Sequence, residues 1–371
     1  MTDAEPIPGA PPPITGEGTF VQLLTPEGER LHHPEYDLEL SDDDYRSLFR
    51  DLVLVRRIDA EATALQRQGE LGLWASLLGQ EAAQVGAGRA LRPADMAFPT
   101  YREHGVAWCR GIDPLTLLGL FRGTTNGGWR PDEHRFALYT IVIGDQCPQA
   151  VGYAMGIQLD GAEEAVMVFF GDGASSQGDV NESFIWASVF NAPVVFFCQN
   201  NQWAISEPLE RQTRIPLYQR ANGFGFPGIR VDGNDVLATL AVTTAMMQRA
   251  REGGGPSLIE AYTYRMGAHT TSDDPTRYRL GSDVEAWKLR DPIERLRSFL
   301  YKQQLVDAAF FAALDEEAEA LAVHLRDGVR ALPDPSTGSM FDHAYAEPHA
   351  QVDADRADFE AYLAGFAEEA R

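Results

Sequence analysis

One carboxylate and a pair of amides stand at opposite ends of a short segment of this sequence, residues 171–201. Asp172 lies between two glycines directly after an apolar run, and Asn200 and Asn201 directly follow a second apolar run. The carboxylate of Asp172 and the amide carbonyl of Asn201 are hard oxygen ligands, which Mg²⁺ prefers, and Mg²⁺ keeps positions open for water and phosphate oxygens. The glycines allow a diphosphate to approach the backbone, and a helix that begins near Asp179 would add partial positive charge.

Two strands and a helix must bring these side chains together. The sequences EAVMVFF (164–170) and PVVFFCQ (193–199) are short and apolar, and DVNESFIWASVF (179–190) between them reads as a helix. Short apolar strands that alternate with helices predict an α/β fold with a mostly parallel sheet and helices on both faces. A right-handed crossover makes the two strands parallel, and ligands bind at the carboxyl ends of parallel strands. We therefore expect Asp172 and Asn201 to lie close together.

The composition and charge indicate which classes of protein this chain can belong to. Of the 371 residues 44% are hydrophobic, which is enough for a sizeable core, and the formal net charge of −24 argues against nucleic acid and anionic membranes as partners. The three cysteines show no disulfide framework and no metal-ligand spacing. The first residues lack the basic start and apolar core of a signal peptide, and no apolar run has the length of a membrane helix. These features predict a cytoplasmic protein.

Three parts of the chain differ in character. Residues 1–35 begin with a Pro- and Gly-rich stretch and are predicted to be a disordered or extended N-terminal arm. Residues 36–330 carry the strand and helix patterns and are predicted to form the α/β domain with helical flanks. Residues 331–371 are predicted to form a helical C-terminal extension with an acidic tail.

Several motifs in the chain resemble the alpha subunit of the two-chain 2-oxo acid dehydrogenases, which depend on thiamine diphosphate. These motifs occur in the family's order between about residues 40 and 350: PQAVGYAMG, GDGASSQGDVNES, QNNQWAIS, RVDGNDV, TYRMGAHTTSDDPTRYR and FDHAYAE. The resemblance implies a thiamine diphosphate-binding fold, with thiamine diphosphate and Mg²⁺ as cofactors.

The resemblance also implies roles for single residues. It implies Asp172 and Asn201 as side-chain ligands of Mg²⁺, and Trp203 as a ligand through its backbone carbonyl. It implies His269 as the active-site histidine, since a neutral imidazole can both give and take a proton near pH 7. The cofactor contacts that it implies are Tyr101, Arg102, Ile141, Ile143, Gly173, Ala174, Gln199 and, again, His269.

The implied activity is the oxidative decarboxylation of a 2-oxo acid, with transfer of the acyl group to the lipoyl group of a carrier acyltransferase. The resemblance also implies a separate beta subunit and an assembly of two alpha and two beta chains. The sequence HTTSDDP (269–275) is most similar to members that act on branched-chain 2-oxo acids such as 3-methyl-2-oxobutanoate. Pyruvate and acetoin remain alternative substrates, and a non-catalytic subunit that keeps the fold remains an alternative function.

Two further segments lead to expectations. The predicted helix 179–190 is apolar over more than one face, which fits either a deep core helix or a contact with another subunit. Residues 266–282 have few apolar anchors and are predicted to be mobile until the cofactor binds. Thr270 stands where mammalian relatives carry a phosphorylated serine, so regulation by a kinase stays open.

Overall fold

A sheet of six parallel strands forms the centre of the molecule, and this confirms the predicted fold class. The computed structural model describes residues 20–369, so the prediction for the Pro- and Gly-rich start of the chain lies outside the described residues. The strand order is β1–β7–β8–β4–β3–β2. The strands are β1 (Phe20–Val21), β2 (Met96–Phe98), β3 (Val166–Gly171), β4 (Val194–Asn200), β7 (Gly228–Asp232) and β8 (Ser257–Tyr262), and a separate antiparallel pair is formed by β5 (Trp203–Ala204) and β6 (Glu207–Pro208).

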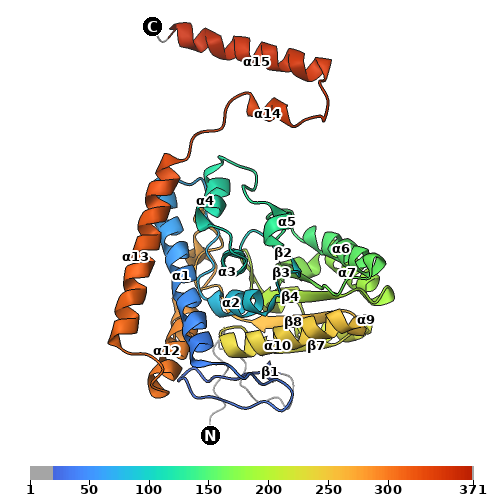
Figure 1. The fold of residues 1–371 in the computed structure, drawn as a ribbon, viewed down its shortest axis with the longest axis vertical. Coiled ribbons are helices and arrows are strands. Elements are labelled where there is room, and N and C mark those ends of the chain that lie inside the picture. The colour runs from blue at the N-terminus through green and yellow to red at the C-terminus, as the bar shows by residue number, and fades with distance from the viewer. Residues whose placement is uncertain (1–19, 370–371) are drawn as a thin grey trace.

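Alternate side chains of the central strands enter two cores on opposite faces of the sheet. On β3, Met167 and Phe169 belong to the core that includes α2 (Glu81–Ala90) and α10 (Val236–Arg249). Val168 and Phe170 belong to the core that includes α6 (Gln146–Asp160) and α7 (Gly178–Val189). Residues 166–170 of β3 and 194–198 of β4 are all apolar because helices cover both faces of the sheet, as Figure 1 shows.

The remaining helices lie around the sheet and the helices that cover its two faces. No helix among residues 20–369 is both long enough and apolar enough to cross a membrane. The remaining helices are α1 (Asp42–Arg67), α3 (His104–Cys109), α4 (Pro114–Arg122), α5 (Pro131–His134), α8 (Leu209–Gln212), α9 (Arg220–Phe224), α11 (Gly281–Lys288), α12 (Pro292–Lys302), α13 (Ala308–Ala331), α14 (Ser339–Asp342) and α15 (Ala350–Glu369).

One buried carboxylate joins the N-terminal edge of the sheet to a core helix. Asp235 precedes α10, and its Oδ1 accepts hydrogen bonds from the backbone N–H groups of Leu237 and Ala238, which would otherwise lack partners at the helix start. Its Oδ2 accepts hydrogen bonds from the N–H groups of Leu23 at 2.7 Å and Leu24 at 2.6 Å. The segment after β1 is therefore tied to the α/β domain.

The C-terminal part is attached to the body in two different ways. Helix α13 lies along α1 (Figure 1), and the two are joined by the ion pairs Arg57–Glu319 at 3.1 Å and Arg326–Glu61 at 2.9 Å. After Ala331 the chain leads away from the body, and α14 and α15 pack on one another. The predicted boundaries at residues 35 and 330 stay predictions.

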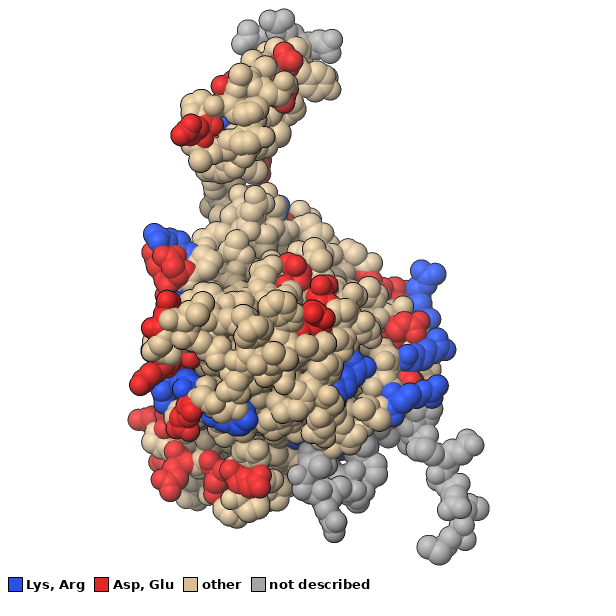
Figure 2. Space-filling view, turned by 90° about the vertical axis from the view of Figure 1, so that its right-hand side faces the viewer, with Lys and Arg blue, Asp and Glu red and all other residues tan. Residues whose placement is uncertain are grey.

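Helix α7 is buried on one face and exposed on the other. Val180, Phe184 and Ala187 are buried, but Trp186 is 47% exposed and Val189 is 74% exposed. The deep-core interpretation of this helix is therefore wrong within the described chain, because the sheet covers only one of its apolar faces. The side of the molecule that carries α6 and α7 in Figure 1 faces the viewer in Figure 2, where large parts of it show no charged side chains.

Candidate active site

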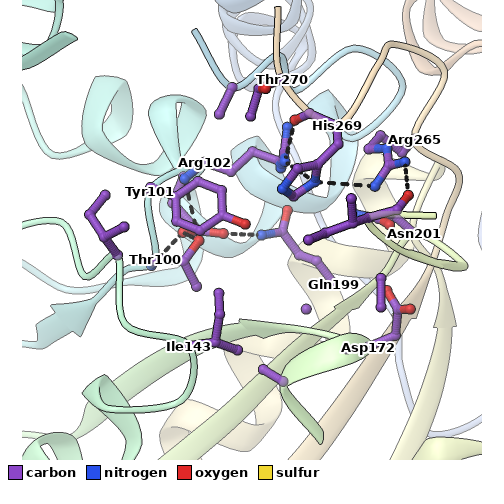
Figure 3. Close-up of a pocket in the computed structure, with 18 of the residues that line it drawn as sticks. Thr100, Tyr101, Arg102, Ile143, Asp172, Gln199, Asn201, Arg265, His269 and Thr270 are labelled. Atoms are coloured by element: carbon purple, nitrogen blue, oxygen red, sulfur yellow. Dashed lines mark hydrogen bonds between the residues drawn. The ribbon is translucent and has the colours of Figure 1, made fainter. Parts of the chain in front are cut away.

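A cavity of about 490 Å³ lies at the carboxyl ends of four neighbouring strands. Residues 100–102 come shortly after β2, Asp172 follows β3, Asn201 follows β4, and Arg265 stands three residues beyond β8. Parallel strands end at the same edge of a sheet, and β3 and β4 pair directly. The structure brings every residue predicted for the metal, the cofactor or catalysis to the lining of this cavity (Figure 3).

The side chains of Asp172 and Asn201 are held by separate hydrogen bonds. Oδ2 of Asp172 accepts a hydrogen bond from Nε2 of Gln212 at 2.8 Å. Burial raises the pKa of Asp172 to about 6, because hydrogen bonds from Gln212 and from the backbone offset only part of the lost solvation. Nδ2 of Asn201 donates to Oε1 of Gln80 at 3.1 Å, and Oδ1 accepts from the N–H of Trp203 at 3.3 Å. This orientation leaves one lone pair of the Asn201 oxygen free.

The donor atoms at this end of the cavity fit a hard divalent cation. No group of three or more His, Cys, Asp and Glu side chains within residues 20–369 is arranged to hold a metal. A cation here would instead bind one carboxylate, one amide oxygen and the carbonyl of Trp203, which is a donor set suited to Mg²⁺. Gly173, which follows Asp172, is packed closely against Ala204. A Cβ at Gly173 would lie 2.7 Å from the Cβ of Ala204, so only glycine fits here.

Two buried guanidinium groups provide positive charge in the cavity. Arg102 is 6% exposed and Arg265 is 1% exposed, and neither forms a salt bridge with a carboxylate of the described chain. Arg265 donates to the carbonyls of Trp203 at 3.1 Å and Ile205 at 2.6 Å. Burial and the nearby Arg102 lower the pKa of Arg265 to about 10, so this side chain stays charged at neutral pH. Buried cations without acidic partners indicate an anionic ligand.

The imidazole of His269 lies beside both guanidinium groups. Its Nδ1 is 3.3 Å from Nη2 of Arg102 and 3.4 Å from Nη1 of Arg265. A guanidinium can only donate, so Nδ1 acts as an acceptor and the proton of the neutral ring is on Nε2. Burial, Arg102 and Arg265 together lower the pKa of His269 to about 4, although Asp273 acts in the opposite direction. His269 is therefore neutral at physiological pH.

The polar residues that the structure adds to the site, and that sequence reasoning missed, include Gln80, Glu103 and Arg265. Glu103 is buried, accepts a hydrogen bond from the N–H of Thr100 at 2.6 Å and a second from Nε2 of Gln199, and burial raises its pKa. Oε1 of Gln199 and Nε2 of Gln80 are buried without a partner in the described chain, which points to a polar ligand. Arg265 stands inside a motif that carries the resemblance and Glu103 directly follows Arg102, whereas no local pattern marks Gln80.

Two other histidines are absent from the cavity lining. The ring of His104 stacks on Trp74 with 4.1 Å between centroids, and its Nε2 lies 2.9 Å from the carbonyl oxygen of Ala75. Burial lowers the pKa of His104 to about 3, so it is a neutral core residue behind the cavity. The imidazole of His134 approaches only the carbonyl oxygen of Arg110.

Comparison with known proteins places these features in a family. The dehydrogenase E1 component family matches residues 50–330. The chain is 46% identical over 349 residues to the 3-methyl-2-oxobutanoate dehydrogenase subunit alpha of Mycobacterium tuberculosis. The aligned region covers 93% of this chain and 94% of that protein. It is 39% identical over 309 residues to the pyruvate dehydrogenase E1 component subunit alpha of Bacillus cereus, which covers 82% and 83% of the two chains. The chain therefore belongs to the dehydrogenase E1 component family, whose members depend on thiamine diphosphate.

Proposed function

We propose that this chain is the alpha subunit of a 3-methyl-2-oxobutanoate dehydrogenase. The complex would decarboxylate branched-chain 2-oxo acids oxidatively and transfer the acyl group to the lipoyl group of an acyltransferase. The observation that carries the proposal is the convergence of Asp172, Asn201 and two unpaired guanidinium groups on one cavity. The identity of 46% to the Mycobacterium tuberculosis subunit, against 39% to the Bacillus cereus pyruvate dehydrogenase subunit, favours a branched-chain substrate.

The cofactor would be held at the ends of β2, β3 and β4. Arg102 would bind the diphosphate, because a planar guanidinium can donate two hydrogen bonds to phosphate oxygens. Mg²⁺ would be held by Asp172, Asn201 and the carbonyl of Trp203. When bound, thiamine diphosphate supplies the electron sink that permits the loss of CO₂ from a 2-oxo acid. The remaining proposed contacts are Tyr101, Ile141, Ile143, Gly173, Ala174, Gln199 and His269.

His269 would handle a proton next to the reacting atoms. Its neutral ring carries the proton on Nε2, because the two guanidinium groups occupy Nδ1. His269 can therefore donate a hydrogen bond from Nε2 to an oxygen of the substrate or of the acyl group on which negative charge develops. Arg102 is assigned to the diphosphate, so Arg265 would be the cation that attracts the substrate carboxylate to the same place.

Part of the cavity lining is apolar, as a branched aliphatic chain would require. Leu73, Ala75 and Phe121 line the cavity together with the polar groups described above. These side chains can bury the methyl groups of 3-methyl-2-oxobutanoate, and each buried methyl or methylene group adds about 0.8 kcal/mol of favourable transfer free energy. Pyruvate lacks the branch and would gain less from this surface.

A beta subunit would complete the site. Ile141 and Ile143 line the cavity but are 63% and 41% exposed, so this part of the lining is not covered by the described chain. The exposed side chains of α7 add a second apolar surface. Large exposed apolar surfaces are typical of subunit interfaces, and we infer an assembly of two alpha and two beta chains.

Calorimetric titration of the assembled alpha–beta complex with thiamine diphosphate, with and without Mg²⁺, tests the cofactor site. We expect Asp172→Ala to abolish the Mg²⁺-dependent part of the affinity, because it removes the only carboxylate of the proposed ligand set. Asp145→Ala is the control, since Asp145 is exposed and does not line the cavity. Unchanged affinity in Asp172→Ala would rule out its assignment as a ligand.

A further inference from the structure

A short segment without regular secondary structure, Trp74–Gly79, supports the loop that carries His269. We refer to residues 74–79 as the platform. The N–H of Trp74 donates to Oγ1 of Thr271 at 3.0 Å, and the N–H of Thr271 donates back to the carbonyl of Trp74 at 2.9 Å. The N–H of Met266 donates to the carbonyl of Leu78 at 3.1 Å. The platform therefore holds the His269 loop on both sides of the histidine.

The same platform holds the guanidinium of Arg102. Nη1 of Arg102 donates to the carbonyl oxygen of Ser76 at 2.5 Å, while Nη2 donates to the carbonyl oxygen of His269 at 2.8 Å. The backbone of the platform is packed tightly against the loop, since a Cβ at Gly79 would lie 2.5 Å from the carbonyl oxygen of Tyr264. A shift of the platform would therefore displace Arg102 and His269 together.

A carboxylate on α1 fixes residues 74–77 of the platform, while Gly79 at its end donates to Glu81 at 3.0 Å. Asp59 on α1 accepts three hydrogen bonds, from Nε1 of Trp74 at 2.8 Å, from Oγ of Ser76 at 2.6 Å and from the N–H of Leu77 at 2.9 Å. Asp59 is 4% exposed and forms no salt bridge with a described residue. Hydrogen bonds to a carboxylate are stronger than neutral ones, and removal of the carboxylate would leave buried donors without partners.

We propose that Asp59 is a positioning residue of the active site, which acts through the platform to hold Arg102 and the His269 loop in their places. Asp59 does not line the cavity and touches neither Arg102 nor His269 directly. The roles of Arg102 and His269 rest on the proposed function, whereas the mechanical link from Asp59 to the loop rests on the contacts alone.

The chain contains a matched control for Asp59. Asp51 lies on the same helix, is 2% exposed and accepts a hydrogen bond from the indole Nε1 of Trp108 at 2.9 Å. Asp51 forms ion pairs with Arg89 on α2 and with Arg50, and none of Asp51, Trp108, Arg89 and Arg50 lines the cavity. Asp51→Asn therefore disturbs a buried carboxylate of the same helix that also accepts an indole N–H, without touching the platform.

Hydrogen exchange followed by mass spectrometry on the alpha–beta complex without cofactor tests the link. In Asp59→Asn we expect peptides that contain the amides of Met266 and Thr271 to exchange about 10-fold faster than in the wild type. We also expect the dissociation constant for thiamine diphosphate to rise about 10-fold, the lower end of what loss of an outer-shell partner produces. In Asp51→Asn both quantities should stay at their wild-type values, even if both variants lose thermal stability to the same extent.

Wild-type exchange of the two peptides in Asp59→Asn, or equal acceleration in Asp51→Asn, would overturn the proposal. If Asp59→Asn does not assemble, Trp74→Phe removes the indole donor to Asp59, keeps an aromatic ring at this position and leaves the Ser76 and Leu77 donors in place. It should accelerate the same peptides, and wild-type rates in Trp74→Phe would overturn the proposal as well. Failure of the wild-type complex to bind thiamine diphosphate would contradict the proposed function, but it would leave the exchange result intact, so the two failures can be distinguished.

Discussion

Arg102 and Arg265 approach the same nitrogen of His269, at 3.3 Å and 3.4 Å, and no carboxylate within residues 20–369 forms a salt bridge with either of them. This arrangement has two consequences at the scale of single residues. It keeps the imidazole neutral, because a proton on Nδ1 would face two positive groups. It also makes this cavity locally attractive to anions in a chain with a formal net charge of −24.

The buried His104 leads to a prediction about pH. Burial lowers its pKa from 6.5 to about 3, so between these pH values the unfolded chain binds a proton at this residue that the folded chain does not. The free energy of unfolding therefore falls as the pH is lowered through this range, by up to about 1.4 kcal/mol per pH unit. His104→Gln keeps a neutral polar side chain and removes this titration.

We expect the difference in the free energy of unfolding between the wild type and His104→Gln to shrink by about 1 kcal/mol per pH unit from pH 6 to pH 4. Urea unfolding at each pH measures this difference, and contributions from other titrating groups cancel in the comparison. A difference that is independent of pH would show that His104 titrates normally in the folded chain.

Two of the predicted site residues can be read from the local sequence, whereas the others rest on the family resemblance. Asp172 and Asn201 stand directly after apolar strands, so their positions at one edge of the sheet follow from the strand pattern. Gln80 and Arg265 depend on how distant segments pack, since the amide of Gln80 accepts a hydrogen bond from Asn201, which is 121 residues away in the sequence. The link from Asp59 to the platform likewise joins residues whose contact no periodic pattern predicts.

At the scale of elements, the unit β3–α7–β4 could be predicted because its strands consist mostly of apolar residues and its helix has apolar residues at helical spacing. The orientation of α7 could not be predicted, because both of its faces carry large apolar side chains and only packing decides which one meets the sheet. Strand β2 has three residues, too few for a periodic pattern. Helix α7 nevertheless points to an interface, because its outer face exposes Ile185, Trp186, Val189 and Phe190.

Val189→Asp tests this interface. Val189 is 74% exposed, so the charge should change the stability of the isolated chain by no more than about 0.5 kcal/mol. In the assembly the charge would be buried without a partner, and we expect sedimentation velocity to show loss of the alpha–beta complex. Leu289→Asp is the control, since Leu289 is 79% exposed and lies outside the described apolar faces of α6 and α7. Normal assembly of Val189→Asp would exclude this face as an interface.

At the scale of the whole molecule, the chain provides one side of a site. Its cavity holds the groups proposed for the metal, the diphosphate and proton handling, but Ile141 and Ile143 remain largely exposed beside it. The C-terminal helices α14 and α15 stand apart from the body (Figure 1). An isolated alpha chain should therefore bind thiamine diphosphate weakly and turn over no substrate.

Co-expression with a beta chain allows the proposed activity to be measured directly. With purified alpha–beta complex, thiamine diphosphate and Mg²⁺, we predict that kcat/KM for 3-methyl-2-oxobutanoate exceeds that for pyruvate by at least about 10-fold, which is the discrimination that extra buried methyl groups provide. Acetoin should be turned over more slowly than either 2-oxo acid, and the alpha chain alone should be inactive. A kcat/KM for pyruvate or acetoin that equals or exceeds that for 3-methyl-2-oxobutanoate would contradict the branched-chain proposal.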